Sequence, residues 1–119
     1  MKDEIESPVV PVCVTVIPDT NGNDQIKCEP NPVPVGDPNT LIAFNLMTPG
    51  YHFKSTNTIV LRGTFPDFPY PSWTLNKTTA GLFDLCNDDD VFAYTVKVKR
   101  DSDGKEFSVD PEIRNGDAM

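Results

Sequence analysis

Apolar and polar residues alternate with a period of two along much of this chain, which is the spacing of a β-strand with one buried face. The clearest run is Phe92, Tyr94, Val96 and Val98, separated by Ala93, Thr95 and Lys97. A turn-forming segment at residues 101–104 follows it, and residues 105–109 resume the strand pattern. The two runs therefore predict an antiparallel β-hairpin.

The same period predicts further short strands, at residues 9–17, 25–29, 40–47, 51–54 and 57–63. Residues 40–47 are apolar enough for a central strand. Two segments stay open, because residues 74–81 give no clear pattern and residues 82–86 fit either a strand or a single helical turn.

Proline is unusually frequent, with 12 in 119 residues against an average of about 5%. It fixes φ and removes a backbone donor, so long helices are disfavoured. Pro30, Pro32 and Pro34 alternate, and we expect residues 29–35 to run extended as an edge strand that crosses between sheets.

Short strands separated by Pro, Gly, Asn and Asp clusters are typical of a β-sandwich or barrel. We predict an all-β fold, an immunoglobulin-like antiparallel β-sandwich of about seven strands. Residues 1–119 are expected to form this single domain, with residues 1–7 and 116–119 as flexible tails.

The charge balance argues against some partners. The net charge of −8 disfavours nucleic acid and anionic membranes, because both select clusters of Lys and Arg. The one basic cluster, Lys97, Lys99 and Arg100, precedes Asp101 and Asp103 and is typical of a solvated strand end.

No apolar segment resembles a signal peptide or reaches the roughly 20 residues of a transmembrane helix, so we expect a cytoplasmic protein. Residues 76–78 fit an N-glycosylation sequon, which would have a meaning only if a secretory signal peptide had been removed. Cys13, Cys28 and Cys86 are odd in number and widely spaced, which indicates buried free thiols. A bridge between Cys13 and Cys28 stays open if their strands are neighbours.

The sequence contains no catalytic or cofactor signature. His52 is the single histidine, which is too few for a copper or zinc site, and a triad would need Ser55 or Cys86 beside it. Residues 19–24 resemble a calcium loop, but the match to the EF-hand pattern is poor and turn chemistry explains the same residues more simply. We expect a protein that is not an enzyme and that has no metal and no cofactor.

The most distinctive segment is the aromatic loop at residues 65–73, whose three prolines exclude regular structure. Stiff aromatic side chains make good anchors for sugars or protein partners. The candidate binding residues are Phe65, Asp67, Phe68, Tyr70 and Trp73. The competing interpretation is that the loop folds back and plugs one end of the sandwich.

Two short segments carry a family resemblance. Residues 28–35, CEPNPVPV, and residues 109–115, VDPEIRN, resemble the DP-EP family of small uncharacterised bacterial proteins through their Glu-Pro and Asp-Pro dipeptides. The resemblance implies a bacterial source and an immunoglobulin-like sandwich, with no assigned activity and no functional residue to transfer. From the residues themselves, Asp110 could accept backbone N–H bonds from the crossing at residues 29–30 or from its own turn.

The leading functional hypothesis is a non-catalytic binding or assembly domain that acts on a protein partner or on a second copy of itself. One alternative is a carbohydrate-binding module that uses the aromatic loop. The other is a small hydrolase with His52 in an unrecognised site.

Overall fold

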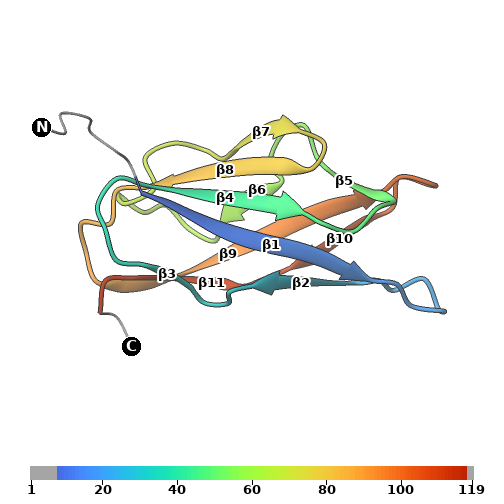
Figure 1. The fold of residues 1–119 in the computed structure, drawn as a ribbon, viewed down its shortest axis with the longest axis horizontal. Coiled ribbons are helices and arrows are strands. Elements are labelled where there is room, and N and C mark those ends of the chain that lie inside the picture. The colour runs from blue at the N-terminus through green and yellow to red at the C-terminus, as the bar shows by residue number, and fades with distance from the viewer. Residues whose placement is uncertain (1–7, 118–119) are drawn as a thin grey trace, which may run out of the picture.

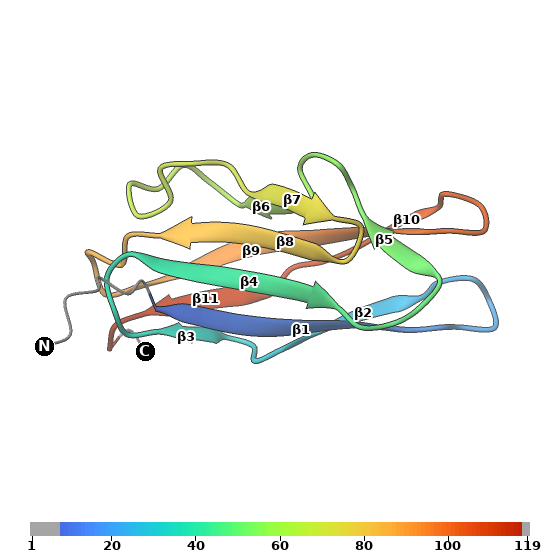
Figure 2. The same cartoon turned by 45° about the horizontal axis from the view of Figure 1, so that its top comes forward.

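The computed structural model describes residues 8–117, which form two β-sheets stacked face to face (Figures 1 and 2). The first sheet has the order β2 (Gln25–Glu29), β1 (Val9–Ile17), β4 (Thr40–Leu46), β8 (Thr79–Asp84) and β7 (Trp73–Asn76). None of the described residues forms a helix long and apolar enough to span a membrane.

The second sheet is built around its longest strand, β9 (Asp90–Arg100). On one side of β9 lie β10 (Glu106–Val109) and β11 (Glu112–Asn115), with β3 (Val33–Val35) beyond β11. The short strands β5 (Tyr51–Phe53) and β6 (Ile59–Leu61) pair with the other side of β9.

The predicted all-β class is confirmed, but the strand number and the sheet type were wrong. The structure has 11 strands instead of about seven. It also pairs β1 with β4 and β11 with β3 in parallel, so both sheets are mixed. The strands that were not predicted from the sequence are β7, β8 and β11, of which β8 had stayed open as a strand or a helical turn. Parallel pairing depends on the path of the chain between strands and leaves no local pattern.

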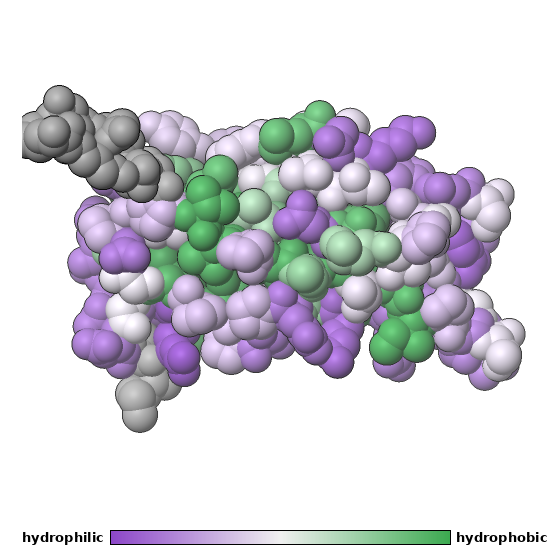
Figure 3. Space-filling model, viewed as in Figure 1, coloured by the Kyte–Doolittle hydropathy of each residue, from purple (hydrophilic) through white to green (hydrophobic). Residues whose placement is uncertain are grey.

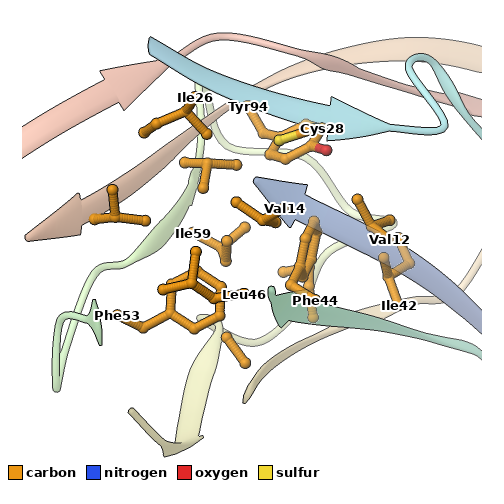
Figure 4. Close-up of a cluster of buried hydrophobic side chains, with 14 of the residues drawn as sticks. Val12, Val14, Ile26, Cys28, Ile42, Phe44, Leu46, Phe53, Ile59 and Tyr94 are labelled. Atoms are coloured by element: carbon orange, nitrogen blue, oxygen red, sulfur yellow. The ribbon is translucent and has the colours of Figure 1, made fainter. Parts of the chain in front are cut away.

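The core fills the space between the sheets, as the period of two requires. Figure 4 shows Val12, Val14, Ile42 and Phe44 from β1 and β4 packed in this layer. The rings of Phe44 and Tyr94 meet across it, with centroids 5.7 Å apart. Each large side chain buried here stabilises the fold by roughly 1.5–3 kcal/mol.

The two open segments form the hairpin of β7 and β8. Its turn is held by Asn76, whose side-chain oxygen accepts the Thr78 backbone N–H at 2.9 Å. Residues 82–86 therefore continue a strand as far as Asp84, and the helical-turn alternative was wrong. The aromatic loop ends one residue earlier than predicted, because Trp73 already begins β7.

The crossing at residues 29–35 ends in β3, which lies at the sheet edge beside β11. Over residues 8–117, no hydrogen bond joins the Asp110 carboxylate to residues 29–30 or to its own turn. Its carboxylate instead accepts the Thr95 hydroxyl at 2.7 Å and pairs with Arg62 at 3.2 Å. Of the predicted tails, residues 1–7 and 118–119 lie outside the described residues, and the Gly116 N–H donates to the Val35 carbonyl at 2.7 Å.

Candidate functional site

The aromatic loop divides into an inward part and an outward part. The rings of Phe65 and Phe68 pack edge-on against Phe92 of β9, with centroids 4.9 and 5.0 Å away, and both are half-buried. Asp67 between them is buried, with 2% of its surface exposed. These three candidate residues therefore plug one end of the sandwich.

Asp67 is held by donors from distant parts of the chain. Its carboxylate accepts the backbone N–H groups of Asn87 and Asp88 at 3.1 and 3.2 Å, and the side-chain amide of Asn115 at 3.0 Å. The same Asn115 nitrogen donates to Asp84 at 3.0 Å. With these contacts made inside the protein, Asp67 ties the loop to β8 and β11 and is not available to a ligand.

Asp84 is the least satisfied member of this network. Its Oδ1 accepts from the Cys86 N–H and from Asn115, whereas its Oδ2 is buried without a partner among the described residues. Burial raises the pKa of Asp84 to about 6, helped by the nearby Asp67 charge and opposed by the two hydrogen bonds. Near pH 6 the carboxyl group is therefore present in comparable amounts of its neutral and charged forms.

Tyr70 and Trp73 form the outward part of the loop and remain exposed, by 61% and 40%. The Trp73 indole covers Gly81 of the neighbouring strand so closely that a Cβ atom there would lie 2.7 and 2.8 Å from its Cζ2 and Cε2 atoms. The indole is therefore held against the sheet at Gly81. The Tyr70 ring packs beside Phe83, with centroids 6.1 Å apart and the two ring planes tilted by 46°.

These two aromatic residues border an apolar sheet surface, which we call the outer face. Val9, Leu41 and Phe83 lie side by side on β1, β4 and β8, and Pro11, Ala43 and Gly81 form the next row. Apart from the buried Asp84, these three strands contain no charged residue. Figure 3 shows apolar surface across the middle of the view, between polar margins.

The outer face was missed from the sequence, although a signal for it was present. Residues 9–17 are predicted only as a strand and residues 40–47 only as a central strand, but in a chain with net charge −8 a solvent-facing strand normally carries charges. Their absence from the outward positions marks a surface that is unusual for solvent exposure.

His52, the residue on which the hydrolase alternative depends, lies on β5 and is half-buried. Its Nδ1 atom is 2.6 Å from Asp101 Oδ1. Over residues 8–117, no hydrogen bond joins it to Ser55 or Cys86, the two nucleophiles considered. The structure thus places a carboxylate beside His52 without an attached nucleophile.

The cysteines do not form the bridge that the sequence left open. Cys28 is paired with Val14, and Cys13 is paired with Glu29, so the two side chains project to opposite faces of their sheet. All three thiols are free. Cys13 is exposed, whereas the sequence predicted a buried thiol. Burial raises the pKa of Cys28 to about 11, which keeps that thiol protonated.

In the acidic loop at residues 19–24, the carboxylate of Asp24 is bound by groups of the protein itself. The Asp24 carboxylate accepts the Tyr51 hydroxyl and the Asp19 N–H, and it pairs with Arg100 at 3.2 Å. The Tyr51 bond is the largest of the effects that lower the pKa of Asp24. Within the part of the chain that the structure describes, no group of three or more His, Cys, Asp or Glu side chains is placed to hold a metal ion.

Comparison with known proteins adds no assignment to this site, since neither a protein-family model nor a curated protein matches the chain. The functional argument therefore rests on the geometry of the outer face and its surroundings.

Proposed function

We propose that this protein is a non-catalytic assembly domain that pairs with a second copy of itself through the outer face. The observation that carries the proposal is the uncharged surface of β1, β4 and β8, bordered by the exposed rings of Tyr70 and Trp73. Exposed apolar surfaces of this kind are typical of interaction sites.

The charge of the chain favours this face for self-association. Two copies with a net charge of −8 repel one another, and the repulsion is smallest where neither copy presents a charged side chain. The aromatic residues are also preorganised, because Trp73 rests on Gly81 and Tyr70 on Phe83 before any partner arrives. Little side-chain entropy is then lost when they bind.

The test is the dependence of solution mass on protein concentration, measured by sedimentation. The wild-type chain should associate, and the double variant Trp73→Ala, Tyr70→Ala should weaken association at least about thirtyfold, the effect of losing a binding hot spot. Ile17→Ala is the matched control, because Ile17 is similarly exposed but lies beyond the two rows of the outer face, where β1 pairs with β2 and no longer with β4. A wild-type chain that stays monomeric at every concentration refutes the proposal.

Carbohydrate recognition is the second candidate, and the exposed indole of Trp73 favours it. Sugar rings stack on such a surface, and the neighbouring row of the sheet offers the polar side chains of Asn45 and Thr79 for their hydroxyl groups. Phe68 and Asp67 no longer belong to this site, because both pack inside the loop. Trp73 is the single tryptophan, so its fluorescence during titration with soluble oligosaccharides reports binding directly.

From residues 28–35 and 109–115 we also infer membership of the DP-EP family, with its immunoglobulin-like sandwich, bacterial source and no assigned activity. A contact between the two segments supports a structural role for them, since the Asn31 side chain accepts the Glu112 N–H at 3.0 Å. A cytoplasmic location remains a proposal of the same kind, and fractionation of cells that express the chain would test it.

A further inference from the structure

A second surface with binding chemistry lies around His52, apart from the outer face. It is a pocket of about 470 Å³ between β5, the turn that follows β5, the β7–β8 turn and β9. Its basic lining residues are His52, Lys54, Lys77 and Lys99, and no aspartate or glutamate lines it. In a chain with 18 acidic and 10 basic residues, this local excess of basic groups is opposite to the overall charge.

Some of this positive charge is compensated at the rim. Lys54 pairs with Glu106 at 2.9 Å, and the His52 Nδ1 atom lies 2.6 Å from Asp101 Oδ1. The pKa of Glu106 is lowered first by its bond to Lys54 and then by the charges of that lysine, Lys97 and Lys99, so one carboxylate is shared among three lysines. Over residues 8–117, Lys77 and Lys99 have no acidic partner within 4 Å. The pocket therefore keeps a surplus of positive charge.

The walls of the pocket are held together by hydrogen bonds between its separate segments. The Phe53 N–H donates to the Lys77 carbonyl at 2.7 Å, which joins β5 to the β7–β8 turn. The Thr74 hydroxyl donates to the Lys54 carbonyl at 2.7 Å, which joins β7 to the chain after β5. A pocket fixed in this way needs little rearrangement to receive a ligand.

The remaining lining supplies uncharged contacts. Ser55 and Thr56 contribute hydroxyl groups, whereas the Phe53 side chain is only 2% exposed and packs in the core. The Asn76 side-chain oxygen is already used by the Thr78 N–H and hydroxyl, which leaves its amide hydrogens as donors. Cations and donors together suit an acceptor-rich ligand.

We propose that this pocket binds a small organic anion, in which a ring-sized skeleton carries a phosphate, sulfate or carboxylate group. The charged group would lie between Lys77 and Lys99, and the skeleton would occupy the rest of the volume beside Ser55 and Thr56. The volume falls within the range of about 300–1,000 Å³ found for small-molecule sites and exceeds what a bare oxyanion fills. This site is separate from the outer face and does not depend on the assembly proposed above.

The single histidine gives the test a unique reporter, since only His52 contributes imidazole resonances to the NMR spectrum. The labelled full-length chain is titrated at constant pH and ionic strength with glucose 6-phosphate, glucuronate, glucose sulfate, inorganic phosphate and neutral glucose. At least one of the three charged sugars should shift the His52 resonances in a saturable way, with a weaker effect of inorganic phosphate and none of glucose. Added salt should weaken the binding, because it screens the charges.

Paired variants separate this site from general electrostatics. Lys77→Gln combined with Lys99→Gln should weaken binding about tenfold, since each exposed ion contact contributes up to about fivefold. Lys27→Gln is the control. Lys27 lies on β2, at the edge of the first sheet opposite to β7, so its substitution should leave binding unchanged.

Three outcomes would overturn the proposal. The first is that no charged sugar shifts the His52 resonances. The second is that the Lys27 variant weakens binding as much as the pocket variants do. The third is that inorganic phosphate binds as tightly as the charged sugars, which would refute the assigned skeleton.

Discussion

The buried Asp84 should make the stability of this protein fall as the pH rises through weakly acidic values. Its carboxyl group is fully buried and has a pKa of about 6 in the folded chain, against about 3.9 for an unfolded aspartate. The folded state therefore holds the proton more tightly than the unfolded state. The stabilisation is complete below about pH 4 and is lost as the pH rises to about 6.

The size of the effect follows from the shift. Two pKa units correspond to about 3 kcal/mol of unfolding free energy. The substitution Asp84→Asn removes the titration but keeps an oxygen that can accept from the Cys86 N–H and the Asn115 amide. Its new amide nitrogen takes the place of the unpartnered Oδ2, at a cost of about 1–3 kcal/mol.

We expect the free-energy difference between Asp84→Asn and the wild type to move in favour of the variant by about 3 kcal/mol between about pH 4 and pH 7. At neutral pH the variant should equal the wild type or exceed it by up to about 2 kcal/mol. Urea unfolding followed by circular dichroism at several pH values measures this difference.

Two features keep the experiment specific. The wild type also contains carboxylates with lowered pKa values, such as Asp103 at about 2, but they are present in both proteins and cancel in the difference. The exposed Asp88, replaced by Asn, is the matched control for the change in charge. A difference between the Asp84 variant and the wild type that stays constant within about 0.5 kcal/mol from pH 4 to pH 7 would refute the reasoning.

Three further predictions follow from the same contacts. Gly81→Ala should displace the Trp73 indole from the sheet and red-shift its fluorescence. The free energy of unfolding should fall by less than about 1 kcal/mol, because an exposed ring can move. An unchanged emission spectrum would contradict the contact. Asn115→Ala should destabilise the fold by about 2–4 kcal/mol in thermal unfolding, because the substitution removes the donor shared by Asp67 and Asp84. A loss below about 0.5 kcal/mol would show that the two carboxylates do not need this donor. In native protein, a thiol reagent should label Cys13 rapidly and Cys28 only after unfolding, and mass spectrometry of the labelled peptides would expose equal reactivity.

The strands that could be predicted from the sequence are those whose side chains face two different environments. Phe92 to Val98 alternate between core and solvent, so the period of two is visible there and the hairpin of β9 with β10 is confirmed. The β7 strand gave no such signal, because Trp73 and Leu75 are exposed and the pairing with β8 is irregular between Thr74 and Asn76. What fixes β7 in place is its contact with β8, which no local pattern contains.

The candidate site was only partly accessible for the same reason. Five loop residues were named from their chemistry, but nothing local distinguishes Phe68, which packs on Phe92, from Tyr70, which stays exposed. Lys99 was assigned to a solvated strand end, because its position beside Lys77 arises only when β9 and the β7–β8 turn meet. The charged residues can be counted from the sequence. The surface on which they gather depends on which strands pair across long distances in the sequence.

The parallel pairing of β3 with β11 also has a consequence for the rate of folding. Asn31 and Glu112, which are hydrogen-bonded beside this pair, are 81 residues apart in the sequence. Because such distant segments must meet before their contacts can stabilise anything, we expect folding in milliseconds to seconds, with the local β9–β10 hairpin forming earlier than the β3–β11 edge. During that interval the uncharged strands β1 and β4 are exposed without their final neighbours, so folding yield should fall steeply as chain concentration rises.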